Sequence, residues 1–328
     1  MHAKHSIVLA SLTLAVFSPL AAAQALSGCS VFPADNVWNT RIDSLPVHPL
    51  SDDYVNRIGR SNPAHADFGA GLLAGSPIGI PFVVVDGSQP QVAMSFTYQD
   101  ESDPGPYPIP PDAPIEGGRQ SSGDRHVLVL DSDRCILYET FSAYAQADGS
   151  WQGGSGAVFD LESNALRPEG WTSADAAGLP ILPGLARYDE VVAGEIRHAL
   201  RFTAPRTQRA YVWPGRHFAS SILDPSYPPM GVRFRLKDSV DLARYSPETQ
   251  VLLRALKTYG MILADNGSPW FISGAPDDRW DNDALAQLRT LHGSDFEAVD
   301  ESSLALDPNS GQIQTHAVSH VAPMIKNR

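Results

Sequence analysis

Residues 125–144 read RHVLVLDSDRCILYETFSAY, two largely apolar runs on either side of a polar turn at residues 131–134. Alternation with a period of two is typical of β-strands, because successive side chains point to opposite faces of a sheet. It places Val127 and Val129 on one face, and it places His126, Leu128 and Leu130 on the other. The sequence therefore predicts a β-hairpin here.

Similar patterns outward from this hairpin predict further strands at residues 82–85, 92–98, 157–160, 196–203, 210–213 and 232–237. The Asn266-Gly267 pair between residues 261–264 and 270–273 often closes a hairpin. Residues 103–118 hold six prolines and cannot pair as a central strand, so we expect an extended loop there.

Two helices are predicted near the end of the chain. Ser246 followed by Pro247 begins one and Gly260 ends it, while Asn282 begins the other and Gly293 ends it. With many short strands and no internal repeat, these patterns favour a mainly β fold: a single β-sandwich or jelly-roll-like domain with two peripheral α-helices, spanning residues 26–300. Periodicity fades from Glu301, so we expect residues 301–328 to form a weakly ordered tail.

The first 25 residues have the pattern of a signal peptide. Lys4 precedes an apolar run at residues 7–20, and the small residues that follow end in Ala23-Gln24-Ala25, so we expect cleavage after Ala25. No later segment is apolar enough to span a membrane. The prediction is a secreted or periplasmic protein, which argues against enzymes that draw on ATP or nicotinamide cofactors.

The chain has two cysteines, Cys29 and Cys135. In an oxidising compartment such a pair indicates one structural disulfide. The alternative is a lipoprotein, because Leu26-Ser27-Gly28-Cys29 also has the form of a processing site at which Cys29 is acylated. The folded-looking sequence directly after Cys29 favours the disulfide.

Composition and motifs exclude several classes of function. The formal net charge is −13, and no basic tail is present, so the chain lacks the clustered cations of a nucleic-acid-binding protein. It has no phosphate-binding glycine-lysine loop, no paired-cysteine metal site and no His-Glu-x-x-His motif. We therefore expect no cofactor and no metal.

Two predicted strands carry arginines opposite their apolar side chains. Arg197 and Arg201 alternate with the apolar residues of 196–203, and Arg233 and Arg235 alternate with those of 232–237. In a sandwich the apolar face points inward, so this pattern predicts an outer cationic groove that grips an oxygen-rich polymer through its guanidinium groups. The alternative is that these arginines pair with carboxylates of the protein itself.

Carboxylates near strand ends and aromatic residues are the catalytic candidates: Glu139, Asp160, Asp189, Glu190 and Asp265. Glycosidic cleavage needs one carboxyl group with a raised pKa and a second that stays ionised. Each candidate also has a structural explanation. Asp265 would shape the turn at Asn266-Gly267, Asp160 would end a strand, and Asp189 with Glu190 would cap a helix.

Aromatic and histidine side chains complete the candidate site. Trp171, Trp213 and Trp270 lie near loops or strand ends, where an indole can stack on the apolar face of a sugar, and we add His217 as a substrate-binding residue. Some of these tryptophans must instead belong to the core. His126, His198 and His217 could also meet at a metal, although histidines in phase with leucine and phenylalanine more often lie in a core.

Export, β-rich structure, loop carboxylates and loop tryptophans together predict an enzyme that hydrolyses the glycosidic bonds of an extracellular polysaccharide. One alternative is a polysaccharide lyase that uses the arginines to neutralise a uronate polymer. Another is a non-catalytic protein that binds sugars or a cell surface. The sequence predicts no oligomeric state.

Overall fold

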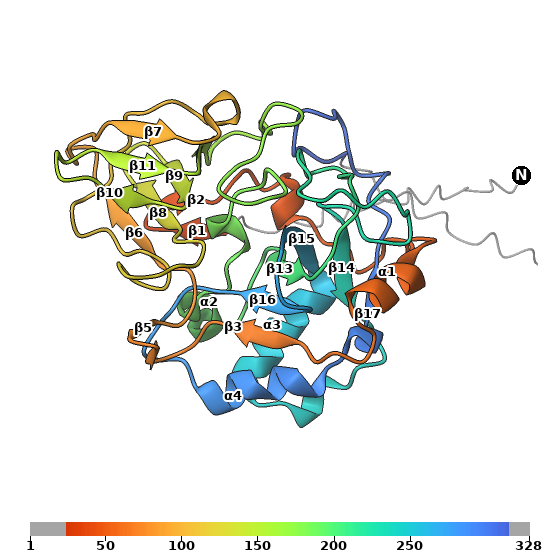
Figure 1. Ribbon diagram of the computed structural model, residues 1–328. Helices are drawn as coiled ribbons and strands as arrows, with labels where there is room; N and C mark the ends of the chain where they lie inside the picture. Colours follow the sequence, from red (N-terminus) through yellow and green to blue (C-terminus); the bar gives the residue numbers. More distant parts are fainter. Residues whose placement is uncertain (1–23, 315–328) are drawn as a thin grey trace, which may run out of the picture.

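The computed structural model describes residues 24–314. The predicted signal peptide therefore lies outside the described residues except for Gln24 and Ala25, and so does the tail beyond residue 314. Strands exceed helices, 27% against 17%, so the mainly β prediction is confirmed. The strands form several separate sheets and none of these closes on itself, so a sandwich or jelly roll is not confirmed (Figure 1).

A four-stranded sheet has the order β12-β9-β8-β6. Its strands are β6 (Phe82–Val85), β8 (Val127–Asp131), β9 (Ile136–Phe141) and β12 (Ser155–Asp160). The predicted hairpin is confirmed, because β8 pairs antiparallel with β9 around residues 132–135. Its two faces enter different apolar clusters: Val127 and Val129 pack near Tyr107, whereas Leu128 and Leu130 belong to the main core. The sheet is therefore covered on both sides.

Smaller sheets are also present among the described residues. A three-stranded sheet joins β10 (Tyr144–Ala145), β11 (Trp151–Gly153) and β7 (Met94–Phe96). Two short hairpins pair β1 (Ala25–Leu26) with β2 (Cys29–Ser30), and β4 (Leu72–Leu73) with β5 (Ser76–Pro77). The proline-rich segment forms no strand, as predicted, and its Tyr107 and Ile109 are buried.

The largest sheet has six strands in the order β17-β14-β15-β13-β16-β3. Their bounds are β3 (His65–Asp67), β13 (Leu200–Ala204), β14 (Arg233–Leu236), β15 (Met261–Asn266), β16 (Phe271–Ser273) and β17 (Phe296–Ala298). The hairpin predicted around Asn266-Gly267 is wrong, because β13 lies between β15 and β16 and pairs with both. A turn signal specifies the reversal of the chain, but not which strand fills the space beside it.

Four α-helices are present among residues 24–314, not two: α1 (Ser51–Ile58), α2 (Tyr188–Ala193), α3 (Pro247–Thr258) and α4 (Asn282–Ala286). Single-turn 3-10 helices also occur: η1 (Val37–Asn39), η2 (Gln99–Glu101), η3 (Leu182–Gly184), η4 (Leu242–Arg244), η5 (Gln287–Thr290) and η6 (Gly293–Asp295). The predicted start of α3 is confirmed, because Ser246 caps it by accepting from the backbone N–H of Thr249. Helices α1, α3 and α4 contact β17, β14 and β3 of the six-stranded sheet.

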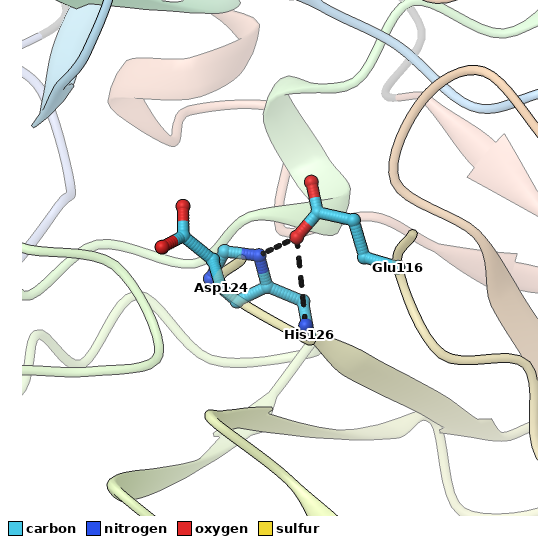
Figure 2. A group of neighbouring side chains, drawn as sticks. All are labelled: Glu116, Asp124 and His126. Atoms are coloured by element: carbon cyan, nitrogen blue, oxygen red, sulfur yellow. Dashed lines mark hydrogen bonds and ion pairs between the residues drawn. The ribbon is translucent and has the colours of Figure 1, made fainter. Parts of the chain in front are cut away.

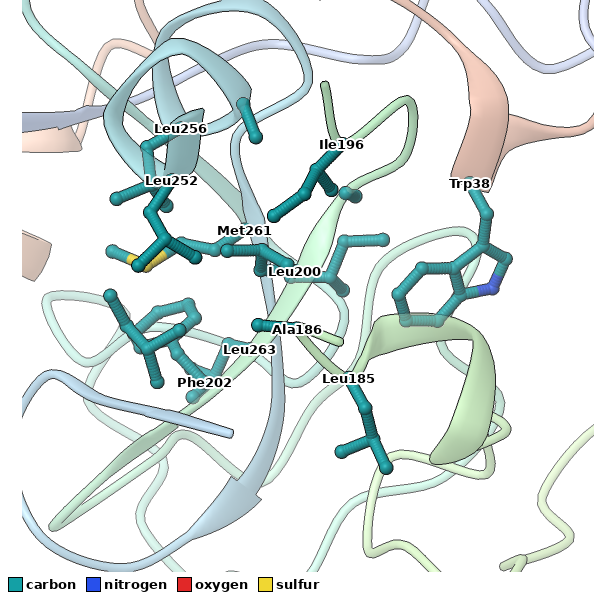
Figure 3. Packing of buried hydrophobic residues seen from close by; sticks show 14 of the residues in the cluster. Trp38, Leu185, Ala186, Ile196, Leu200, Phe202, Leu252, Leu256, Met261 and Leu263 are labelled. Carbon is teal, nitrogen blue, oxygen red and sulfur yellow. The ribbon is translucent and has the colours of Figure 1, made fainter. Parts of the chain in front are cut away.

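The main core lies between α3 and the central strands of this sheet. Figure 3 shows Leu252 and Leu256 of α3 above Met261 and Leu200, with Phe202 beside them. All five side chains are buried. Burial of such side chains supplies most of the free energy that holds a helix against a sheet.

The predicted disulfide between Cys29 and Cys135 is confirmed, with the two Cα atoms 5.5 Å apart. It joins β2 to the turn of the β8–β9 hairpin, and because it uses Cys29, this structure does not fit acylation of that thiol. No helix among residues 24–314 is long and apolar enough to cross a membrane.

Residues 301–314 differ from the expected weakly ordered tail, because they pack on the rest of the molecule. Glu301 is buried and pairs with Arg233, with 2.9 Å between Oε1 and Nη1. The backbone N–H groups of Gly311 and Ile313 donate to the carbonyls of Asn164 and Asp35. Such isolated long-range contacts leave no periodic pattern in the sequence, which is why the prediction missed them.

Candidate functional site

A cavity of about 370 Å³ opens between the four-stranded and six-stranded sheets. Phe141 at the end of β9 and Ser155 at the start of β12 form one wall, and Asp265 and Asn266 at the end of β15 form another. The remaining lining comes from loops: Tyr98, Glu101, Asp124, Thr172, Ser173, Ala174, Ala176, His217 and Ala219. Three carboxylates, one histidine and two aromatic rings therefore share one concave space, the usual form of a small-molecule site.

Asp265 is the predicted catalytic residue that the structure places in this cavity. Its side chain keeps 21% of its surface exposed, so it can still be reached from the cavity. Burial and the nearby charge of Asp175 raise the pKa of Asp265 to about 7, against the opposing effect of Arg201. A carboxyl group that still holds its proton near neutral pH can act as a general acid.

Arg201 lies beneath Asp265 and is almost fully buried, so it is not part of an outer surface. Its guanidinium donates two hydrogen bonds to Asp175, at 2.6 and 2.7 Å, and a third to Ser273. Its Nη2 also lies 3.5 Å from a carboxylate oxygen of Asp265. This bidentate pair fixes the charge next to Asp265 in one geometry.

Glu101 and His217 are neighbours in the lining of the cavity. Nδ1 of His217 lies 2.8 Å from the backbone carbonyl of Ala176, and because a carbonyl only accepts, Nδ1 must carry a proton. Nε2 therefore points toward Glu101, 3.7 Å from its carboxylate. The His217 ring also stacks on Phe218, and the backbone N–H of Thr172 donates to Glu101. Contacts within the protein therefore hold both side chains in place.

Glu116, Asp124 and His126 form the one group among residues 24–314 whose ligand atoms could surround a metal ion, all within 4.8 Å of one another. Figure 2 shows the Glu116 carboxylate against the imidazole of His126, 2.6 Å from Nδ1. Nε2 of His126 lies 3.0 Å from the carbonyl of Ala174. Although burial alone favours neutral imidazole, Glu116 raises the pKa of His126 to about 9. Both ring nitrogens of His126 therefore face oxygen acceptors, and the geometry fits an ion pair between His126 and Glu116.

His126, His198 and His217 do not form a metal-binding group in the described chain. His198 is fully buried and contacts Glu190, with 3.2 Å between Nε2 and Oε1. Each of the three rings thus has its own carboxylate and its own backbone carbonyl. The core interpretation holds for His126 and His198, whereas His217 reaches the cavity.

The other predicted catalytic carboxylates lie outside the cavity. Glu139 is fully buried on β9, where it accepts from the backbone N–H groups of Ile181 and Leu182 and holds the start of η3; burial raises its pKa to about 7. Glu190 of α2 is buried between Arg187 and His198. Burial opposes its ionisation, but the contacts with His198 and Arg187 hold the pKa of Glu190 below its ordinary value.

Asp189, beside Glu190 on α2, points to solvent with 55% of its side chain exposed. It lies 3.3 Å from Arg187. Asp160 ends β12, as its structural explanation required, and its side chain accepts from the backbone N–H of Glu162. Neither carboxylate faces the cavity.

The outer cationic groove predicted from Arg197, Arg201, Arg233 and Arg235 is wrong. Arg233 is fully buried and pairs with Glu301, while Arg235 pairs with Glu297 and donates to backbone carbonyls. Arg197 is the exposed member and pairs with Glu195. Both faces of the six-stranded sheet are covered by other parts of the protein. Alternation along its strands therefore separates apolar side chains from charged ones, but it does not separate buried side chains from exposed ones. The alternative, pairing with the protein's own carboxylates, is confirmed.

The three predicted tryptophans also lie outside the cavity. Trp270 is fully buried and stacks near Phe202 and Phe296. Trp213 lines a second cavity of about 320 Å³ and donates to the carbonyl of Ser310. Trp171 is half-buried beside Arg167. The aromatic rings that do line the candidate site are Tyr98 and Phe141.

Sequence reasoning missed Glu101, Asp124 and the buried Asp175 that raises the pKa of Asp265. Glu101 follows β7 in a one-turn helix, and Asp124 comes just before the hairpin strand β8. Polar residues next to strand ends are frequent in functional loops, and this was the available signal. It could not show that segments so distant in sequence meet.

No protein family model, curated protein or solved structure matches this chain. The cavity joins a carboxyl group with a raised pKa, two further carboxylates and an oriented histidine.

Proposed function

We propose that this protein is an exported enzyme that hydrolyses glycosidic bonds of an extracellular polysaccharide, with the cavity around Asp265 as its active site. The observation that carries the proposal is the raised pKa of Asp265 in a cavity that also contains Glu101 and Asp124. Glycoside hydrolysis requires such a division between a protonated and an ionised carboxyl group.

In this mechanism Asp265 protonates the oxygen of the leaving sugar. Glu101 is the second carboxyl group of the mechanism, the base or nucleophile at the anomeric carbon, and its contacts with Thr172 and His217 hold it at the cavity. The Arg201–Asp175 pair positions Asp265 and does not touch the substrate. Tyr98 and Phe141 offer apolar faces to a sugar ring, and the side chains of Thr172 and Asn266 offer polar groups to its hydroxyls.

Export belongs to the same proposal. A polysaccharide outside the cell is accessible to a protein that leaves the cytoplasm, and the Cys29–Cys135 disulfide is the kind that persists in secreted or periplasmic proteins. The signal-like N-terminal sequence supports the same location.

The test is the Asp265→Asn variant, assayed for new reducing ends on a panel of neutral and acidic polysaccharides. Loss of general acid catalysis lowers rates by about 10²- to 10⁴-fold, and we expect a loss of that size in kcat with the fold unchanged by circular dichroism. Asp189→Asn is the matched control, because its carboxylate lies in solvent away from the cavity. Full activity of Asp265→Asn would refute the proposed acid.

The same assay separates hydrolysis from the two alternatives. A lyase leaves a new carbon-carbon double bond in its product, and this bond absorbs light. A rise in absorbance would therefore show elimination and not hydrolysis. In that case His217, which lines the cavity, is the candidate base. The outer arginine face that motivated the lyase is absent from the described residues. Retention on a polysaccharide without any product would leave the sugar-binding alternative.

A further inference from the structure

The cavity beside Trp213, of about 320 Å³, shares no lining residue with the cavity around Asp265. Its volume falls within the range of about 300 to 1,000 Å³ that is usual for small-molecule sites. Part of its wall is aliphatic, from the side chains of Val212, Pro229, Val232 and Val299. The exposed Val212 and Ser302 place the cavity at the surface of the molecule. The proposed mechanism uses none of these residues.

Trp213 gives this cavity an aromatic wall that is fixed in position. Its indole N–H donates to the carbonyl of Ser310 at 2.8 Å, and its ring packs against the small buried cluster of Ile42, Val299 and Leu304. The side chain is half-buried and also lines the cavity. Because the ring is already held in place, a ligand that stacks on it orders little further, and the apolar face of a sugar suits such a ring.

His48 adds a hydrogen-bond donor to the lining. The backbone N–H of Leu50 donates to Nδ1 of His48 at 3.1 Å, so the proton of the neutral ring is on Nε2. Burial lowers the pKa of His48, against the opposing effect of Asp300, and so favours the neutral ring. The ring also stacks on Tyr54, with the two centroids 5.2 Å apart. Nε2 has no hydrogen-bond partner among residues 24–314, and it can therefore donate to a ligand.

Two neighbouring carboxylates supply acceptors. Asp300 uses Oδ1 to accept from the backbone N–H of Ser302 at 2.9 Å, and Glu301 uses Oε1 to accept from Arg233 at 2.9 Å. The second oxygen of each carboxylate has no hydrogen-bond partner in the part of the chain that the structure describes. A wholly apolar ligand would leave these oxygens and the His48 donor unpaired, and an anionic ligand would meet two negative charges.

We propose that this cavity is a second carbohydrate site that binds a neutral sugar unit, with its apolar face on Trp213 and its hydroxyl groups on His48 and the two carboxylates. A hydroxyl group both donates and accepts, which matches one imidazole donor beside two carboxylate acceptors. A second site would hold one part of a polysaccharide on the enzyme while the Asp265 cavity acts on another part. In this role the inference rests on the proposed function, but binding at Trp213 does not require hydrolysis.

The test is isothermal titration calorimetry with a panel of neutral and uronate oligosaccharides. The titrations use the Asp265→Asn variant, so that the sugars are not consumed. We expect neutral oligosaccharides to bind, and we expect Trp213→Ala, made in this background, to weaken the binding at one site by about tenfold. His48→Ala should weaken the same site, and circular dichroism checks that each variant is folded. Tyr144→Ala is the control, because this exposed aromatic ring lines neither cavity.

The outcomes separate this inference from the proposed hydrolysis. Binding that is unchanged in both Trp213→Ala and His48→Ala would overturn the inference, whether or not the parent protein cleaves a polysaccharide. Tighter binding of uronate than of neutral oligosaccharides, or no binding to any member of the panel, would overturn it as well. Binding that depends on Trp213 in a protein that releases no reducing ends would support the second site and refute the proposed hydrolysis.

Discussion

The surroundings of single carboxyl groups decide which of them can do chemistry. Asp265 and Glu139 both have raised pKa values, but Asp265 lines a cavity and Glu139 is fully enclosed and bound to backbone N–H groups. Glu190 is also buried, yet its contacts with His198 and Arg187 keep its pKa below the ordinary value. The raised pKa thus supports the proposed catalytic role of Asp265, which lines the cavity, and it accompanies a structural role for the enclosed Glu139.

The raised pKa of Glu139 has a consequence for stability. The folded state binds this proton more tightly than the unfolded state, in which the pKa is near 4.5. The contribution of Glu139 to the free energy of unfolding is therefore greatest below pH 4.5, and it decreases as the pH rises toward 7. In Glu139→Gln, which has no proton to lose, we expect this fall to be weaker by an amount on the order of a few kcal/mol.

The measurement is urea unfolding of the parent and of Glu139→Gln at several pH values between 4.5 and 7.5. Glu162→Gln is the control, because this glutamate is exposed and lies just beyond the neighbouring strand β12. A pH dependence in Glu139→Gln as steep as that of the parent would contradict the assigned pKa.

Strands and helices that carry local sequence signals were predicted well, but the strands with which they pair were not. The β8–β9 hairpin and the start of α3 follow from a polar turn, alternation and a Ser-Pro cap within a few residues. The pairing of β13 with β15 and β16 joins residues about sixty to seventy positions apart, and no local pattern encodes it. For the same reason the cavity between the two sheets could not be predicted.

The disulfide gives a prediction about these elements, because it ties β2 to the β8–β9 turn across a sequence separation of 106 residues. Closing a loop of this length restricts the unfolded chain by about 4 to 5 kcal/mol. We expect the double variant Cys29→Ser/Cys135→Ser to lose stability by about that amount, measured by urea unfolding without reductant. An unchanged midpoint would show that the bridge does not constrain the unfolded chain.

The molecule as a whole is closed by residues 301–314, which return to contact the six-stranded sheet and the loop at Asn164. The buried charge of Arg233 depends on residues 301–314, because Arg233 is fully buried and Glu301 is its carboxylate partner. Burial alone holds the pKa of Arg233 below its ordinary value, with Glu301 acting in the opposite direction.

Removal of one partner from a buried ion pair costs about 3 to 5 kcal/mol, because the other charge stays buried without compensation. We therefore expect Glu301→Ala to lower the free energy of unfolding by about that amount, measured by chemical denaturation. Ser303→Ala is the control, because Ser303 is exposed two residues further on. A stable protein truncated after Asp300 would contradict the structural role assigned to this segment.

The sequence by itself determined the mainly β composition, the disulfide, the hairpin and the α3 helix, because short-range spacing and two cysteines suffice for each. Tertiary structure alone decided that Arg233 is buried, that Trp270 belongs to the core, and that Asp265 meets Glu101 and Asp124 at one cavity. Alternation shows which side chains share a face of a strand. Whether that face meets solvent, a second sheet or a cavity depends on elements far away in the chain, and the long-range packing of those elements sets both burial and pKa.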